Sequence, residues 1–300
     1  MRLKTILCLV IFGLVLIAAC AGLFYQTPGA PIPYVTVRGE QATFYGAGLY
    51  RYDPVSVARE GKVWDAINLI LALPMFAVAI YLDWRRSLRG RLLLSGLLFY
   101  FAYQYLQYAA MLAFNPLFLV YVTIFALSAV AFFINLADID VARLPSQISA
   151  KFPRRLFIAF TFVMGAALIL LWLGRIIPFT LAGRFPDELA GMTTLVTQAL
   201  DLGMVVPLML ATGILLWWRS AWGYFLAAVS LTFGFIMSVT LPAWIIVPLV
   251  QDGVVNLVEA SPLLVLCAIG LYVAVQFFRS IQPGETPARA SALQSCSADR

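Results

Sequence analysis

The sequence has no histidine among its 300 residues. This absence excludes bis-histidine haem, histidine-bearing zinc or di-iron sites, and histidine general bases. Cysteine is scarce as well: Cys8, Cys20, Cys267 and Cys296 form no CxxC pair, and three of them lie in or beside apolar runs. Such thiols are typical of small apolar packing residues and not of a redox or thiolate-metal centre. We therefore expect no cofactor and no metal site.

Charged residues are scarce as well. Only 11% of the residues are charged and 63% are hydrophobic, which leaves too little polar surface to cover a water-soluble globule. Repeated apolar runs of membrane-spanning length predict an all-α, polytopic transmembrane helical bundle surrounded by membrane lipid. The net charge of +6 comes from short clusters of Lys and Arg beside those runs. That placement sets membrane topology, so we expect no nucleic-acid partner.

Eight segments are long and apolar enough to span a bilayer. They lie near 5–24, 63–82, 92–114, 116–137, 156–178, 196–218, 221–243 and 257–278. The basic residues of the short loops fall on one side, which we expect to be cytoplasmic, together with both termini. The chain then divides into a first helix (1–24), an external segment (25–62), helices two to four (63–137), a cytoplasmic loop (138–155), helices five to eight (156–279) and a disordered cytoplasmic tail (280–300).

The first segment has two interpretations. A basic start followed by an apolar run is also the layout of a signal peptide, and Ile17-Ala18-Ala19-Cys20 approximates a lipoprotein cleavage box. Cys20 would then be the lipidated N-terminus of the mature protein. We favour an uncleaved first helix, because the box has isoleucine where leucine is preferred.

The external segment contains two patterns. YVTVRGEQATFYG predicts a short hairpin that turns near 38–40. In YDPVSVAREG, Asp53 can cap free amides, Pro54 suits the first helical position and Gly61 can end the helix. The second pattern predicts a separate short helix at the membrane surface.

An internal duplication is visible when the numbering is shifted by 133. Residues 65–95 and 198–228 then share nine identities in 31 positions without a gap. The spaced landmarks are a proline (Pro74, Pro207), a tryptophan ten residues later, and an Arg-Ser pair followed by glycine at the cytoplasmic turn. The simplest account is two four-helix repeats of the same orientation, as in some transporter folds. The alternative is that the two segments acquired these residues independently, since proline and interfacial tryptophan are common in membrane helices.

Polar residues gather at one level of the predicted spans. The spacings of Asp65 with Asn68 and of Gln198 with Asp201 place each pair on one helix face. The full set of candidate ligand-binding residues is Asp65, Asn68, Gln104, Gln107, Arg175, Gln198, Asp201 and Glu259. Polar groups at membrane depth are costly and mark functional sites, so this set predicts an outward-facing pocket with Arg175 as the counter-ion. The alternative is that these residues only join helices by hydrogen bonds. The tyrosines at 103, 105 and 108 are typical of packing and interfacial anchors.

Three functions fit these patterns. The first is transport or binding of a small solute or ion in the outer pocket. The second is a non-catalytic sensor or assembly protein that acts through residues 25–62. The third is an intramembrane lipid-modifying enzyme, which is less favoured because no GxSxG, metal cluster or phosphate-binding loop is present. The oligomeric state is open.

Four blocks carry a resemblance to a known group of proteins: GLYRYDPVSVA, RRSLRGRLLLSG, FNPLFLVYV and ALDLGMVVPLMLATGILLWWRSAWGYFLAA. They resemble the recurring blocks of an uncharacterised family of bacterial multi-spanning membrane proteins, from Gly48 to about Ala228. The resemblance implies a bacterial inner-membrane protein and brings no activity with it.

Overall fold

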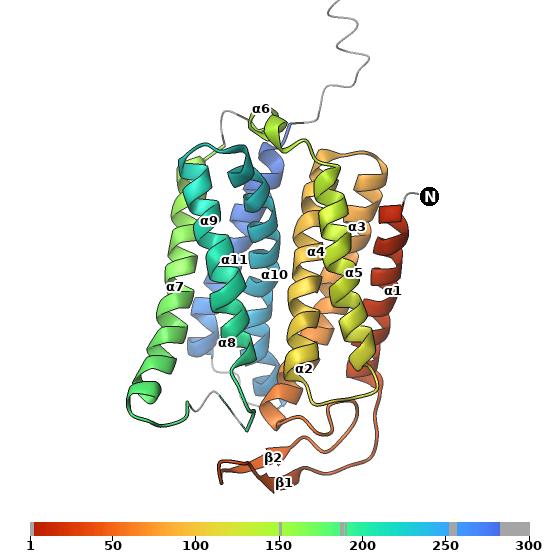
Figure 1. Ribbon diagram of the computed structural model, residues 1–300, viewed down its shortest axis with the longest axis vertical. Helices are drawn as coiled ribbons and strands as arrows, with labels where there is room; N and C mark the ends of the chain where they lie inside the picture. The colour runs from red at the N-terminus through yellow and green to blue at the C-terminus, as the bar shows by residue number, and fades with distance from the viewer. Residues whose placement is uncertain (1–2, 150–151, 187–188, 190, 252–256, 283–300) are drawn as a thin grey trace, which may run out of the picture.

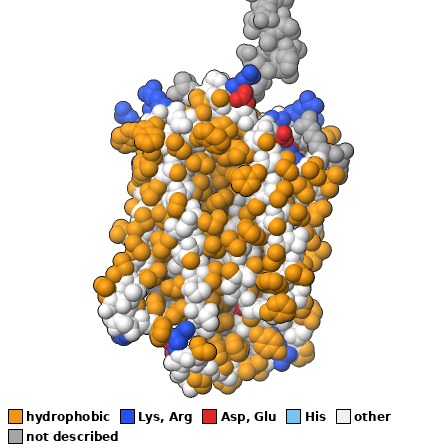
Figure 2. Space-filling model, in the orientation of Figure 1, with side chains coloured by type: hydrophobic (Ala, Val, Ile, Leu, Met, Phe, Trp, Pro, Cys, Tyr) orange, Lys and Arg blue, Asp and Glu red, His pale blue; other side chains and the backbone are white. Residues whose placement is uncertain are grey.

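The computed structural model describes residues 3–149, 152–186, 189, 191–251 and 257–282, with no side chains described between 244 and 263. Within that part of the chain, six helical segments are long and apolar enough to cross a membrane. They are Leu3–Phe24, Val55–Trp84, Phe118–Ala137, Arg154–Leu181, Val196–Trp217 and Ala221–Ala243. Hydrophobic side chains cover most of the visible face between the two ends, and Lys and Arg lie at the ends (Figure 2). The predicted helical bundle with apolar spans is confirmed at this level.

The helices run roughly parallel to one another along the long axis (Figure 1). The first part of the chain forms α1 (Leu3–Phe24), β1 (Ile32–Val35), β2 (Gln41–Phe44), α2 (Val55–Ile67), η1 (Asn68–Ala72), α3 (Leu73–Trp84), α4 (Leu88–Met111) and α5 (Phe118–Ala137). The second part forms η2 (Val141–Arg143), α6 (Leu144–Gln147), α7 (Arg154–Leu181), α8 (Val196–Leu200), η4 (Asp201–Val205), α9 (Val206–Trp217), α10 (Ala221–Gln251) and α11 (Leu257–Ser280). We call the two ends of the bundle the α6 end and the hairpin end (Figure 1).

The long helices form two groups in space. Helices α1, α3, α4 and α5 pack together, and α7, α9, α10 and α11 pack together beside them (Figure 1). Contacts between α4 and α10 join the groups. Gly96 of α4 lies directly against the side chain of Thr232 of α10, where a methyl group would not fit. A small residue at this point therefore lets the two helices approach closely.

Both helices with a predicted mid-helix proline widen into a π-helical turn. The turns Asn68–Ala72 and Asp201–Val205 start at positions related by the same shift of 133, and they end two residues before Pro74 and Pro207. Proline has no N–H for the carbonyl four residues earlier, so an ordinary α-helical pattern is interrupted there. Asn68 and Asp201, both predicted site residues, are the first residues of these turns.

The turns that follow α3 and α9 have the same geometry. Arg86 and Arg219 have positive φ angles of 57° and 58°, and the bonds around them form Schellman motifs, as in Ser220 N–H to the carbonyl of Leu215. Gly90 and Gly223 then lie against the backbone of the preceding helix, where an added Cβ would come within 2.6 Å of backbone atoms. The two helix pairs therefore share these features at positions that match under the shift found in the sequence.

The separate surface helix predicted before residue 62 is wrong. The helix begins at Val55 and continues through Gly61 to Trp84, because Gly61 is buried under the ring of Tyr50 and does not end a helix. Asp53 does not cap this helix; its carboxylate accepts a hydrogen bond of 2.6 Å from the backbone N–H of Ala113. The helix that contains the second predicted span therefore begins at Val55, eight residues before residue 63.

The predicted hairpin is confirmed. Strands β1 and β2 pair antiparallel, with Val35 opposite Gln41, and Gly39 takes a φ of 82° in the turn. The rings of Tyr34 and Phe44 stack with centroids 3.7 Å apart. At the other end, Ile148 pairs with Ile281, which ties the loop between α5 and α7 to the end of α11. Most of the predicted tail, 283–300, lies outside the described residues.

Candidate polar site

The candidate residues predicted from the sequence lie on five helices. Asp65 and Asn68 belong to α2 and η1, Gln104 and Gln107 to α4, Arg175 to α7, Gln198 and Asp201 to α8 and η4, and Glu259 to α11. The side chain of Glu259 is outside the described residues. The others do not form one group. Asp65 and Asp201 belong to two separate clusters of hydrogen bonds, and Gln198 is buried about one turn before Asp201.

The first cluster is centred on Asp201. Its carboxylate accepts hydrogen bonds from the hydroxyl of Tyr103 at 2.6 Å and from the indole N–H of Trp172 at 2.9 Å. The guanidinium of Arg175 lies over the ring of the same tryptophan, 5.9 Å from its centroid. Neutral donors from α4 and α7 therefore hold the Asp201 carboxylate in place, and Arg175 adjoins it through Trp172.

Gln107 extends this cluster toward α2. Its amide nitrogen donates to the hydroxyl of Thr197 at 2.8 Å and lies 3.5 Å from the carboxylate of Glu60. The indole N–H of Trp64 is at the same distance from Glu60. Gln107 therefore lies between Glu60 of α2 and Thr197 of α8, about one turn before Asp201. We call Glu60, Tyr103, Gln107, Trp172, Thr197 and Asp201, together with Gln104 one turn before Gln107 on α4, the outer polar site.

Gln104 is the unusual member of this site. It is fully buried, and neither its amide nitrogen nor its carbonyl oxygen has a hydrogen-bond partner among the described residues. It lies one helical turn from Tyr100 and from Tyr108, whose hydroxyls donate to Asn68 and to the carbonyl of Gly61. Gln104 therefore faces α2 and η1 from α4. A buried polar group without a partner costs about 1–3 kcal/mol, so its retention needs a reason.

Asp65 belongs to the second cluster. Its carboxylate accepts hydrogen bonds from the hydroxyls of Tyr50, at 2.5 Å, and Tyr108, at 3.2 Å, and it packs against Gly22 of α1. Tyr108 and Tyr103 are five residues apart on α4, which separates them by roughly 140° around the helix. Asp65 and Asp201 thus bind different sides of α4. The hydrogen bonds therefore do not bring Asp65 and Asp201 together, whereas the carboxylate of Glu60 lies beside Gln107.

Sequence reasoning missed six members of these clusters: Tyr50, Glu60, Tyr103, Tyr108, Trp172 and Thr197. The sequence pattern assigns Glu60 to a surface helix, although it lies four residues before Trp64 and shares its helix face. The tyrosines of α4 are predicted to be packing or interfacial anchors, as aromatic residues often are in membrane proteins. They are instead buried, and Tyr103 and Tyr108 donate to carboxylates. The available signal was that these tyrosines lie within one or two turns of Gln104 and Gln107 on the same helix.

The outer polar site offers both donors and acceptors. The carboxylates of Glu60 and Asp201 and the unpaired carbonyl oxygens of Gln104 and Gln107 are acceptors, while the amide nitrogen of Gln104 is a donor without a partner among the described residues. Oxygen ligands of this kind suit a hard cation or the ammonium or hydroxyl groups of a small solute. No group of His, Cys, Asp and Glu that could hold a metal ion is present in the described part of the chain.

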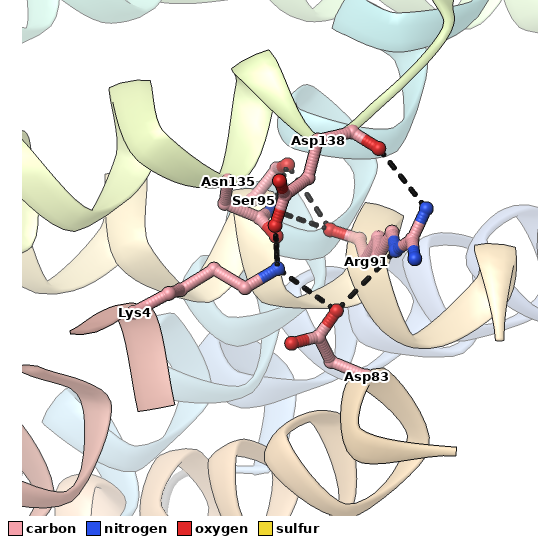
Figure 3. Close-up of polar contacts among 6 residues, drawn as sticks. All are labelled: Lys4, Asp83, Arg91, Ser95, Asn135 and Asp138. Atoms are coloured by element: carbon pink, nitrogen blue, oxygen red, sulfur yellow. Dashed lines mark hydrogen bonds and ion pairs between the residues drawn. The ribbon is translucent and has the colours of Figure 1, made fainter. Parts of the chain in front are cut away.

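A separate ionic cluster lies at the α6 end (Figure 3). Lys4 of α1 is 3% exposed and bonds to Asp83 at 2.9 Å and Asp138 at 2.8 Å. It also donates to the amide oxygen of Asn135 at 3.0 Å, and Arg91 lies 3.4 Å from Asp83. The cluster joins α1, α3, α4 and α5, because each supplies one or more of its residues. Asn135 is fully buried in this cluster.

The hairpin packs on the loop between α7 and α8. Arg38 donates to the carbonyl of Met192 at 2.9 Å and lies over the ring of Phe185, 5.2 Å from its centroid. Its ion pair with Glu40 lowers the pKa of that carboxyl, chiefly through their hydrogen bond. A cavity of about 480 Å³ lies between β2, the start of α2 and this loop. The external segment is thus attached to both halves of the bundle.

Comparison with known protein families, with curated proteins and with solved structures found no match for this chain. The function of the outer polar site is therefore argued from its own geometry and chemistry.

Proposed function

We propose that the chain is an integral membrane protein of eight spans, arranged as two four-helix repeats of the same orientation. Support comes from the features that recur under the shift of 133 in the numbering: the π-helical turns, the arginines with positive φ and the glycines that follow them. Chance identities between apolar residues would not explain why the backbone has the same conformation at these related positions. Helix α4, with two arginines near its start, and α11 would be the spans beyond the six most apolar ones.

The function that the geometry supports best is binding of a small polar solute or a cation at the outer polar site, for transport or sensing. The observation that carries this proposal is Gln104, whose buried amide has no partner among the described residues while two carboxylates lie on neighbouring helices. A bound solute would satisfy the amide and offset the cost of burying it. Both halves of the chain contribute, since Glu60 and Gln104 come from the first and Thr197 and Asp201 from the second. The π-helical turn at Asp201 adds support, because such turns are frequent at functional sites.

The orientation follows from charge. The short loops at the α6 end carry most of the Lys and Arg residues, which supports a cytoplasmic α6 end and an external hairpin end. The outer polar site would then open toward the outside. A bacterial inner membrane and two cytoplasmic termini stay predictions.

Retention of α1 is part of the proposal. Lys4 is buried in the ionic cluster, and α1 continues past Cys20, which is half-buried, to Phe24. Cleavage before Cys20 would remove Lys4 and leave two carboxylates without their lysine. Asp83 would keep Arg91 as a partner, but the loss of a buried lysine from an ion pair is destabilising, so the geometry favours the uncleaved helix over a lipidated Cys20. Intact-mass analysis of the membrane-extracted protein tests this directly, because a lipidated protein would lack everything before Cys20 and carry acyl chains instead.

The test of the proposed function is ligand-dependent thermal stabilisation of the purified protein. The panel contains sodium, potassium and ammonium chlorides, neutral amino acids and simple sugars, with choline chloride as the reference. We expect one of these solutes to raise the melting temperature of the wild-type protein and not that of Asp201→Asn. Asp140→Asn is the matched control, since Asp140 is an exposed residue whose ion pair with Arg143 lies at the α6 end. A panel without any shift, or an equal shift in Asp201→Asn, would contradict the proposal.

A second candidate function is sensing or assembly through the external segment. The cavity between β2 and the loop after α7 favours it, because a partner could bind there without entering the bundle. Replacing residues 32–44 with a flexible linker leaves the start of α2 intact. Loss of function in a correctly folded protein that still binds its solute would support this candidate over the first.

A further inference from the structure

A cavity of about 500 Å³ opens at the α6 end, where the start of α7 meets the turn between α9 and α10. Arginine dominates its charge: Arg154, Arg155 and Arg219 line it together with Ser149, Phe152 and Tyr224, and none of its described lining residues is acidic. Basic cavities between membrane helices on the cytoplasmic side are the usual receptors of anionic lipid headgroups. The cavity is remote from the outer polar site, which lies near the other end of the same helices.

Two features of the cavity point to an anion. The Nε atom of Arg154 is shielded from solvent and has no acceptor among the described residues. A buried guanidinium N–H without an acceptor is costly, and a phosphate oxygen is a favoured partner for it. Arg154 is also the first residue of α7, a helix of 28 residues. The positive end of its dipole adds to the field of the three arginines.

Arg219 gives an independent observation. It occupies the left-handed position of the Schellman motif after α9, with φ of 58°. Glycine is the usual residue there, because a side chain in this conformation costs about 1–2 kcal/mol. The arginine at this position places its guanidinium at the cavity, although the backbone conformation there favours glycine. Arg86 takes the same conformation after α3, and of these two arginines Arg219 is the one that lines the cavity.

The surroundings of the cavity indicate membrane depth. Trp217, Trp218 and Trp222 beside it are all exposed, Trp218 by 72%. Exposed tryptophans at a helix end are typical of the headgroup region. Leu156, which also lines the cavity, is exposed on α7 and is suited to contact acyl chains. A ligand in this place meets phosphate-binding groups on one side and hydrocarbon on the other.

We propose that this cavity is a binding site for the phosphate headgroup of an anionic phospholipid, held by Arg154, Arg155 and Arg219. The lipid would anchor the start of α7 to the turn between α9 and α10. Both elements belong to the second half of the chain, so the site acts within one half.

The experiment uses the full chain in phosphatidylcholine nanodiscs with and without phosphatidylglycerol, with melting temperature and retained lipid as readouts. We expect phosphatidylglycerol to stabilise the wild-type protein and to be retained through purification. Arg219→Gly should bind it roughly fivefold more weakly, which corresponds to about 1 kcal/mol for one basic residue near a membrane surface. The variant itself should fold well, because glycine relieves the backbone strain.

Arg86→Gly is the matched control. Arg86 has the same positive φ in the equivalent turn after α3 but does not line the cavity. We expect it to bind phosphatidylglycerol like the wild-type protein. Equal losses in Arg86→Gly and Arg219→Gly would overturn the proposal in favour of general attraction between the basic end and the membrane. Equal stabilisation by inorganic phosphate in pure phosphatidylcholine would overturn it in favour of a site for free phosphate.

Discussion

Gln104 permits the sharpest prediction: Gln104→Leu should stabilise the protein in the absence of a solute. The wild-type amide is fully buried, and neither of its polar atoms is paired within the described part of the chain; each unsatisfied buried group costs about 1–3 kcal/mol. Leucine has a similar volume and no polar atom. Hydrogen bonds within membrane proteins average only about 0.6 kcal/mol, so we expect the lower part of that range, about 1–2 kcal/mol. For a chain of this size, that is an increase of roughly 2–8 °C in melting temperature.

The assay is thermal denaturation of purified variants in phosphatidylcholine nanodiscs at one scan rate, in choline chloride buffer. Asn135→Leu is the control, because Asn135 is an equally buried amide whose atoms bond to Lys4, Ser95 and the carbonyl of Arg91. It should lose about 1–3 kcal/mol. The two substitutions are thus expected to have opposite signs. Destabilisation of Gln104→Leu by as much as Asn135→Leu would refute the reasoning, since the amide would then already have partners.

Three further predictions concern stability. Lys4→Met should cost about 3 kcal/mol, the lower part of the range for breaking a buried ion pair because one partner carboxylate is over a third exposed; chemical denaturation measures it, and an unchanged midpoint would contradict the role given to the ionic cluster. Burial raises the pKa of Asp53 from its ordinary 3.8 to about 7, so the uncharged carboxyl favours the folded state and its contribution is lost as pH rises from about 4 through 7. The melting temperature should fall with pH across that interval in the wild-type protein and fall less steeply in Asp53→Asn; equal slopes would contradict this prediction. Gly223→Ala should destabilise by about 1–3 kcal/mol because its Cβ would collide with the backbone of the preceding helix, while Gly203→Ala, at an open position, should not; equal melting temperatures would contradict the close approach.

Composition and local pattern were enough to predict several parts of the fold. The helical bundle follows from apolar runs whose backbone groups must bond internally in lipid. The hairpin follows from a glycine that can take positive φ between two short alternating runs. The landmarks around Pro74 and Pro207 predicted equivalent turns, because proline and glycine act on the backbone of their own helix and need no distant partner.

Only the tertiary structure decided which polar residues meet. Asp65 and Asn68 share a helix face, but the face alone does not say which helix lies against it. The segment before α2 brought Tyr50 to Asp65, and the packing of α4 brought Tyr108 there. The position of α8 brought Asp201 to Tyr103. The role of Lys4 was equally invisible, since its partners Asp83 and Asp138 belong to the far ends of later helices. Helix periodicity is a local property that the chain carries in its own order of residues, whereas the neighbour of a given face depends on how all the helices pack.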